Sequence, residues 1–129
     1  MTPAQNIASR DRNLARNGED VILTRNTIGP NSVQIPVSVK VRAKVSGYQP
    51  QELIAGSGIV QGDVKIIISP TQIDAAQWPG TVPTNPKGDP RIPIAGDTFL
   101  VAGRTLTVKA AIPRRIDDVL VRMECQARG

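Results

Sequence analysis

The feature that most constrains this chain is the strict alternation of the stretch "QIPVSVKVRAKVS", which runs from residue 34 to residue 46. Every second position in its central part is apolar: Val37, Val39, Val41, Ala43 and Val45. Three of the side chains between them are cations: Lys40, Arg42 and Lys44. Successive side chains of a β-strand point to opposite faces, so a period of two indicates a strand. We predict a long strand with one apolar and one basic face, and Pro36 fits an edge position or the beginning of a strand.

The composition favours the same class of structure. Valine and isoleucine together supply 27 of the 129 residues, whereas leucine supplies six, and there are 11 glycines and 11 prolines. β-Branched residues favour strands, and glycine and proline favour the turns between them. A chain of this length is one domain that can bury a core of its own. We therefore expect a mainly-β fold rather than a helical bundle.

Other stretches of period two complete the predicted sheet. The first strand covers residues 19–25, with Val21 and Leu23 on one face. "IVQGDVKIIIS" predicts a strand interrupted at Gly62-Asp63, and "DTFLVAGRTLTVKAAI" predicts a hairpin that turns near Ala102-Gly103. In the last strand, polar residues alternate with Val119, Val121, Met123 and Cys125. Closure removes exposed strand edges, so we predict a small antiparallel β-barrel of six or seven strands.

Two helices are predicted beside the strands. Residues 1–18 form an N-terminal helical arm, because Thr2 and Gln5 make a capping box and Asn17-Gly18 is a natural stop. Its apolar stripe is thin, so we expect it to lie on the outside of the barrel or on a neighbouring subunit. "PTQIDAAQW" predicts one short internal helix, with Ile73 and Trp78 touching the core. Residues 19–129 make up the barrel domain.

A Gly-Asp pair precedes an apolar run twice, at Gly62-Asp63 and at Gly96-Asp97. A phosphate-binding loop would need a helix after the glycine turn, but strand-like runs follow both pairs. We therefore interpret the pairs, together with Gly103, as structural turns. In this interpretation glycine adopts the turn geometry, and aspartate accepts hydrogen bonds from the amides that follow it.

The residues that usually carry catalysis are missing or isolated. The chain has no histidine, and Cys125, in its alternating strand, is expected to be a buried structural thiol. Asp117 and Asp118 are adjacent, so along a strand they would point to opposite faces. No loop repeats acids at the spacing of metal ligands. We expect no enzyme activity, no cofactor and no metal site, and a single cysteine allows no internal disulfide.

The net charge of +5 predicts an acidic partner surface or nucleic acid. Proteins that bind single-stranded nucleic acid normally stack the bases on several aromatic side chains. This chain has only three aromatic residues, Tyr48, Trp78 and Phe99, which argues against that partner in its usual form. No stretch approaches a membrane span, and the first residues lack the apolar core of a signal peptide. We expect a soluble, cytoplasmic product without membrane contact.

Four stretches resemble one known family in their order: "RNGEDVILTR", "GYQPQELIAGSGIVQGDVKIIIS", "IAGDTFLVAGRTLTV" and a last strand that ends in Arg-Gly. Over residues 17–129 the chain is similar to the small head-closure proteins of tailed bacteriophages, also called stoppers or head-tail connector proteins. The resemblance rests mainly on the two Gly-Asp pairs, the second followed by Gly103. It implies a small β-barrel that forms a homo-oligomeric ring in the virion, at the head-tail interface, after assembly in the host cytoplasm.

The resemblance also implies partners and a function. Members of that family lie below the portal and adaptor proteins, retain the packaged DNA, and offer a docking surface to the tail terminator or tail proteins. A different ring protein of the neck, such as a tail terminator, also assembles as a ring in the virion and stays open as an alternative. An OB-type barrel that binds single-stranded nucleic acid is a second alternative, because it shares the size and the basic charge.

Two features become candidate sites under this resemblance. The loop at residues 79–93, with five prolines, is a candidate segment for contacting a neighbour or entering the ring channel, as is the connection at residues 48–58. The loop residues singled out are Gly80, Pro83, Pro86, Lys87, Asp89 and Arg91. The basic face of Lys40, Arg42 and Lys44 is a candidate docking surface for an acidic ring or for the packaged DNA end. The plainer interpretations, a solvated loop and a solvated strand face, stay open.

Overall fold

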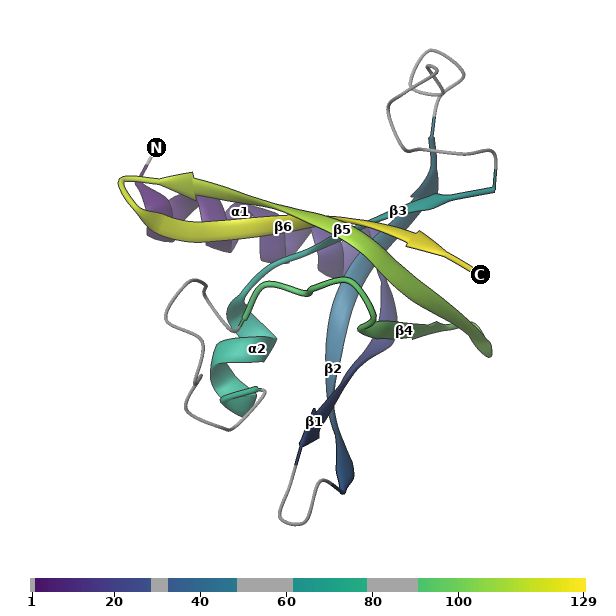
Figure 1. Ribbon diagram of the computed structural model, residues 1–129. Helices are drawn as coiled ribbons and strands as arrows, with labels where there is room; N and C mark the ends of the chain where they lie inside the picture. The colour runs from purple at the N-terminus through teal and green to yellow at the C-terminus, as the bar shows by residue number, and fades with distance from the viewer. Residues whose placement is uncertain (1, 29–32, 49–61, 79–90) are drawn as a thin grey trace.

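Six antiparallel strands close into a barrel in the computed structural model, which describes residues 2–28, 33–48, 62–78 and 91–129 (Figure 1). The strand order around the barrel is β1-β2-β3-β6-β5-β4. The elements are α1 (Pro3–Asn17), β1 (Glu19–Ile28), β2 (Gln34–Gly47), β3 (Val64–Ile68), α2 (Thr71–Ala76), β4 (Thr98–Val101), β5 (Arg104–Ile116) and β6 (Val119–Arg128). The predicted class is confirmed: a mainly-β antiparallel barrel with an N-terminal helix and one short internal helix.

The ladder between β1 and β2 confirms the predicted strand faces. β1 pairs along its whole length with residues 34–43 of β2. Val21 lies opposite Val41 and Leu23 opposite Val39, and all four side chains are buried. The cations at the alternate positions of β2 lie on the outer face. The period of two therefore separates the interior of the barrel from its surface.

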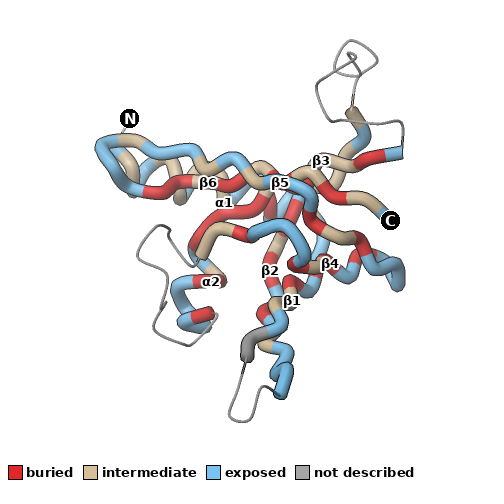
Figure 2. Tube along the Cα trace, in the orientation of Figure 1, coloured by how far each residue is buried: buried red, intermediate tan, exposed pale blue. Residues whose placement is uncertain are grey.

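Every strand contributes to the barrel interior. Its buried side chains include Phe99 of β4, Ile66 of β3 and Cys125 of β6. Ile73 of α2 and Trp78, which follows that helix, belong to the same core cluster, as predicted. Figure 2 shows buried positions along the inner faces of the strands and exposed positions toward the ends of the longer hairpins.

The last strand departs from the predicted alternation near its beginning. Met123 and Cys125 face the core as expected, but the pairing between β5 and β6 skips Val121, which marks a β-bulge. Val119 is consequently 44% exposed, Leu120 joins the core, and Val121 is buried outside the core cluster. The prediction of one continuous apolar face is wrong here, because a bulge adds one residue to one strand of a pair.

Two hairpin turns use backbone with positive φ. Ala102 and Gly103 have φ of 49° and 83°, which confirms the predicted turn between β4 and β5. Asp117 and Asp118, expected on a strand, instead form the turn between β5 and β6, with φ of 50° and 64°. A turn with both central residues in the left-handed region matches the twist of the strands it joins, and aspartate tolerates that region better than most residues.

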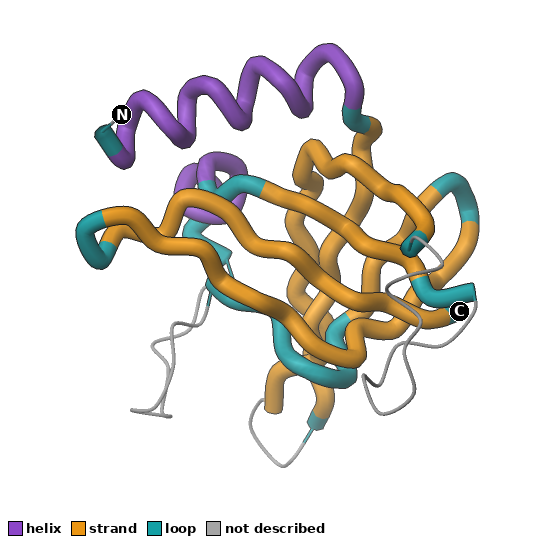
Figure 3. Tube along the Cα trace, turned by 90° about the horizontal axis from the view of Figure 1, so that it is seen from above, coloured by secondary structure: helices purple, strands orange, loops and turns teal. Residues whose placement is uncertain are grey.

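Helix α1 lies on the outside of the barrel, the first of its two expected positions (Figure 3). The predicted capping box is present: Thr2 Oγ1 accepts from the Gln5 amide at 3.1 Å, and the Thr2 amide donates to Gln5 Oε1 at 2.9 Å. The helix packs against β6 and β2 and buries Leu14. At Gly18 a Cβ would lie 2.5 Å from the Leu14 carbonyl oxygen and 2.7 Å from that of Ala43. Glycine follows the helix because the backbone passes too close for a side chain.

Replacing Val39 by aspartate should abolish cooperative folding. The side chain lies among apolar residues of the core cluster, and an uncompensated buried charge costs about 3–5 kcal/mol. Lys44→Asp, which places the same carboxylate on the exposed face of β2, is the matched control and should change stability by about 0.5 kcal/mol. Denaturant unfolding followed by circular dichroism measures both variants. A soluble Val39→Asp protein that unfolds cooperatively would contradict the assigned strand face.

Candidate functional site

Both Gly-Asp pairs stand immediately before a short strand. Gly62 has φ of 95° and Gly96 has φ of 99°, in the left-handed region that glycine adopts without strain, so the predicted turn geometry is confirmed. Asp63 and Asp97, which follow these glycines, are buried. A buried carboxylate is tolerated only where cations or hydrogen-bond donors satisfy it. The partners of the two aspartates therefore decide what the pairs do.

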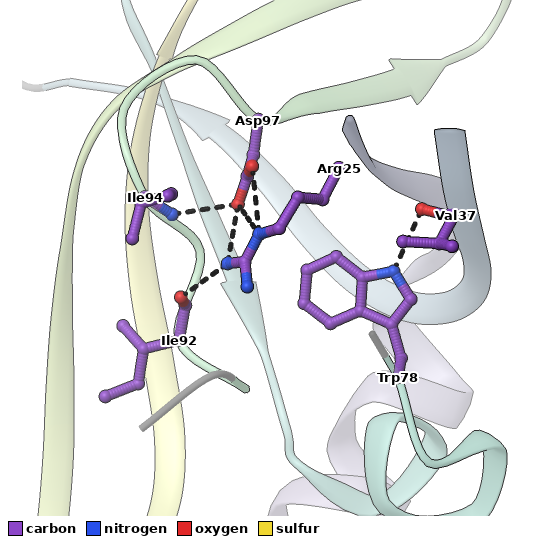
Figure 4. A network of polar contacts seen from close by, with 6 residues as sticks. All are labelled: Arg25, Val37, Trp78, Ile92, Ile94 and Asp97. Atoms are coloured by element: carbon purple, nitrogen blue, oxygen red, sulfur yellow. Dashed lines mark hydrogen bonds and ion pairs between the residues drawn. The ribbon is translucent and has the colours of Figure 1, made fainter. Parts of the chain in front are cut away.

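Asp97 binds Arg25 of β1 (Figure 4). Arg25 Nε lies 3.2 Å from Oδ1 and 3.1 Å from Oδ2, and Nη2 lies 2.9 Å from Oδ2. Nη2 also donates to the Ile92 carbonyl at 3.0 Å, and Asp97 Oδ2 accepts from the Ile94 amide at 2.9 Å. The prediction that Asp97 accepts from the amides that follow it is wrong, because its turn folds back and presents an amide three residues earlier in the chain.

Trp78 extends this network to a second strand. The Arg25 guanidinium lies over the indole ring, with Cζ 4.6 Å from the ring centre, and Trp78 Nε1 donates to the Val37 carbonyl at 3.0 Å (Figure 4). The negative face of an aromatic ring attracts a cation in this position. One arginine thus connects β1, the segment before β4 and Trp78, beyond the end of α2, and through Trp78 it also connects β2.

The Arg25–Asp97 pair extends the seam that closes the barrel. β1 and β4 are joined at residues 22–24 and 98–100, and Thr24 opposite Thr98 is the terminal pair. Arg25 and Asp97 occupy the next cross-strand position in the same register. The ion pair therefore continues the seam where the backbone ladder ends.

Asp63 has the same arrangement with β6. Arg128 Nε donates to Oδ1 at 2.7 Å and Nη2 to Oδ2 at 3.1 Å, while Gln126 Nε2 donates to Oδ2 at 2.7 Å. In the β3–β6 ladder, Asp63 and Arg128 occupy the position beyond the terminal pair. The hydrogen bond to Asp63 raises the pKa of Arg128. We call this pair and Asp97–Arg25 the strand-start clamps, because each fixes the beginning of a short strand to its neighbour.

Within the predicted basic face, Arg42 is part of the fold. Its Nε donates to the Leu14 carbonyl at 2.9 Å and Nη2 to the Ala15 carbonyl at 3.2 Å. Carbonyl groups at the C-terminal end of a helix attract cations, so Arg42 caps this end of α1, together with the Gly18 amide that also donates to the Leu14 carbonyl. Arg42 Nη1 also lies 3.3 Å from Asp20 Oδ1, and this hydrogen bond is the main cause of a lowered Asp20 pKa.

Lys40 and Lys44 keep the exposed positions that the alternation predicted. Lys40 Nζ lies 3.5 Å from Asp20 Oδ2, in a solvent-exposed pair of the kind that contributes little to stability. A cleft of about 390 Å³ opens beside Lys40, between β2 and α1, and Asp11 lies in the same wall as the cations. Both signs of charge therefore line the cleft. The part of the basic face that remains available to a partner is Lys40 and Lys44.

The loop and the connection singled out from the sequence lie mostly outside the described residues. This applies to residues 49–58 and to Gly80, Pro83, Pro86, Lys87 and Asp89. Arg91 is described, and its Nη1 donates to Asp74 Oδ1 at 3.1 Å and to Oδ2 at 3.3 Å. Pro93 is fully buried. The C-terminal end of the loop is therefore anchored to α2 and the core, so a segment that reaches a neighbour has to end before Arg91.

Two hairpins extend beyond the strands that flank them (Figures 1 and 2). β3 pairs with β6 only from Met123 onward, and β4 pairs with β5 only up to Thr107, so residues 112–122 form a largely two-stranded β5–β6 arm. The arm exposes Ile112 at its base, at 52%, and Val119 near its turn. The arm therefore presents apolar side chains to solvent on a hairpin that projects from the barrel.

The second extension is the β1–β2 arm, residues 25–28 and 33–37, which points in another direction (Figure 1). β4 pairs with β1 only at residues 22–24, so the arm continues past the seam. Val33 and Ile35 are exposed on it. Pro36 lies on a stretch of β2 that pairs with β1 alone among the described strands, which confirms its predicted edge position.

No protein-family model matches the chain, and no curated protein matches it. The roles of the site residues therefore follow from their contacts and positions in the fold. The clamps and the cap by Arg42 are structural, whereas the two arms and the exposed lysines are available to partners.

The described residues hold little that resembles reactive chemistry. Cys125 is buried, and burial is the main cause that raises its pKa to about 12, which matches the predicted structural thiol. In the described part of the chain, no group of three or more histidine, cysteine, aspartate or glutamate side chains is placed to hold a metal ion. No helix in that part is long and apolar enough to cross a membrane.

Asp97→Asn should destabilise the barrel by about 3–5 kcal/mol, because it leaves the Arg25 guanidinium buried without its counterion. Asp74→Asn is the matched control, since it removes an exposed carboxylate from Arg91 and should cost less than about 1 kcal/mol. The free energies of unfolding are compared by urea titration. Equal losses in the two variants would mean that the clamp contributes no more than a surface ion pair.

The stability of the protein at alkaline pH should depend on Cys125. The ordinary thiol pKa of 9.0 applies to the unfolded chain, and burial raises it to about 12 in the folded chain. The contribution of the neutral thiol is therefore complete below pH 9 and is lost as the pH rises toward 12, because the unfolded state ionises first. Urea midpoints of the parent and of Cys125→Ala, measured from about pH 8 to about pH 11, should show the steeper decline in the parent. Parallel curves would count against a buried neutral thiol.

Proposed function

We propose that this protein is a structural ring subunit of the bacteriophage neck, a head-closure (stopper) protein that joins the portal and adaptor to the tail and retains the packaged DNA. The observation that carries the proposal is a closed barrel from which two arms extend, each with exposed aliphatic side chains. The resemblance in the order of the Gly-Asp pairs supports it, because both pairs fix strands of that barrel.

The arms supply the kind of surface that a ring subunit needs. A subunit in a closed ring contacts one neighbour with one surface and the other neighbour with a different surface. The β5–β6 arm and the β1–β2 arm leave the barrel in different directions, and each carries exposed aliphatic side chains (Figure 1). Neither set is needed for the core, which the inner faces of the strands fill. The arms are therefore the proposed homo-oligomeric contacts.

The remaining partners are assigned to other parts of the surface. Lys40 and Lys44 form the proposed docking face for an acidic ring of the portal, adaptor or tail, since exposed cations steer such encounters. The loop at residues 79–90 is the proposed segment that faces the channel and the DNA end. The proposal includes no catalytic activity and places the protein in the virion.

The proposed function is tested in the phage that encodes the chain, with the gene interrupted by an amber codon. Electron microscopy of the lysate should show heads that have lost their DNA and unattached tails of normal length. Tails of uncontrolled length would instead identify a tail terminator. Intact, infectious particles would overturn the proposal of a neck protein.

Complementation of the amber mutant with a variant of the β5–β6 arm tests the observation on which the proposal rests. Ile112→Ser/Val119→Ser should fold with a free energy of unfolding within about 0.5 kcal/mol of the parent, because both side chains already face solvent. It should fail to restore infectivity if the β5–β6 arm contacts a neighbour. Ile22→Ser/Leu100→Ser, which changes an exposed apolar pair on the barrel wall, is the matched control. Full infectivity with the arm variant would remove the arm from the assembly contact.

A further inference from the structure

A group of arginines lies where α1 packs beside the β5–β6 arm. Arg114 Nη2 lies 3.3 Å from Glu124 Oε2, and Arg122 Nη2 lies 3.2 Å from Glu124 Oε1. Arg10 belongs to α1, which packs against β6, the strand of Arg122 and Glu124. Burial is the main cause of a lowered Arg10 pKa, and the charge of Arg122 lowers it further. Two guanidinium groups therefore share one carboxylate, and a third belongs to the helix packed against that strand, which leaves an excess of positive charge at this junction.

Two donors of this group have no acceptor in the described part of the protein. The Nε atoms of Arg10 and Arg122 are both buried and make no hydrogen bond there. The Glu124 carboxylate binds the Nη2 atoms of Arg114 and Arg122, and neither unpaired Nε atom reaches it. Buried N–H groups in folded proteins are normally paired, and an ordered water or a bound ion can satisfy one that has no partner in the chain. An oxyanion placed at this junction would satisfy both donors.

The neighbouring surface of α1 supplies further donors. Asn6, Ser9, Arg10 and Asn13 line a hollow of about 140 Å³. Their spacing of three, four and seven residues places them on one face of the helix. Each side chain carries an N–H or O–H group, and none is apolar. A polar wall that includes a cation and several donors suits an oxyanion and offers nothing to an aliphatic or aromatic group.

We infer that this surface binds the phosphate backbone of duplex nucleic acid without reading its sequence. We call it the arginine site: Arg10, Arg114 and Arg122 with the donor face of Asn6, Ser9 and Asn13. Arginine, serine and asparagine are the side chains that proteins use to contact backbone phosphates, and the planar guanidinium matches a phosphate group in two-point contacts. The inference goes beyond the proposed function, because it concerns the outer surface of α1 and holds whether or not the chain forms a ring.

Two observations favour nucleic acid over an acidic protein. The hollow lacks the apolar side chains that usually form the centre of a protein–protein contact. The net charge of +5 adds an attraction that acts along an extended polyanion. The shortage of aromatic side chains does not oppose this inference, because backbone contacts to a duplex require no base stacking.

The test is fluorescence anisotropy with the purified full chain and a labelled duplex of about 20 base pairs, titrated over a series of salt concentrations. For the parent, the logarithm of the association constant should fall linearly with the logarithm of salt concentration. Arg10→Gln/Arg114→Gln should make that slope shallower by about two, because each lost phosphate contact removes about 0.9. Arg104→Gln/Lys109→Gln removes the same charge from exposed positions of β5, outside every surface assigned to a partner, and should leave the slope unchanged.

A second variant keeps the test decisive if loss of the arginines disturbs folding. Ser9→Asp retains all three arginines and places a carboxylate in the hollow, so it should weaken duplex binding and preserve the unfolding midpoint. Equal effects of the two double variants would reduce the binding to net charge and overturn the site. Absence of binding by the parent at the lowest salt concentration would also overturn it. Competition by poly-glutamate as strong as that by unlabelled duplex would assign the surface to an acidic protein instead.

Discussion

The closure of the barrel depends on one buried ion pair. The β1–β4 seam has three backbone pairs, fewer than any other junction in the barrel. Arg25 and Asp97 extend it by one position with charge-assisted hydrogen bonds, which are stronger than those between neutral groups. Burying both charges is tolerated because Asp97 has a second donor, the Ile94 amide, and Arg25 has a second acceptor, the Ile92 carbonyl. The seam, the end of α2 and the β1–β2 arm are held in place through this pair.

Much of the fold could be predicted from the sequence because its signals are local. Alternation in residues 34–46 is a property of neighbouring positions, and so are the capping box of α1 and the glycine turns. The clamps could not be predicted, because Arg25 and Asp97 are 72 residues apart and face each other only in the final register. The bulge at Val121 could not be predicted either, because it depends on how the β5–β6 hairpin accommodates its turn. A sequence pattern indicates which face of a strand a residue occupies, but only the pairing of the strands determines which residue lies opposite it.

The candidate site was less predictable for a related reason. A run of cations on β2 indicates charge but not what covers it, and α1 turns Arg42 from a surface residue into a helix cap. The arms depend on differences in length between neighbouring strands, which become visible only when the strand order is known. Arg10, Arg114 and Arg122 come from three different elements, so no stretch of sequence displays them together. The charge and length of a strand can be predicted from consecutive residues, whereas these sites combine residues that are far apart in the sequence.

The narrow seam has a consequence for how the chain folds. The β4–β5 and β5–β6 hairpins join strands across two-residue turns, whereas closure must bring together residues more than 70 positions apart. Closing so large a loop carries a high entropic cost, so the hairpins form first and the seam forms last. Until that step the edges of β1 and β4 are both open, and each is complementary in register to the other. At high protein concentration a second chain can supply the missing edge and close the barrel in trans, and dilution during refolding therefore favours the self-closed subunit.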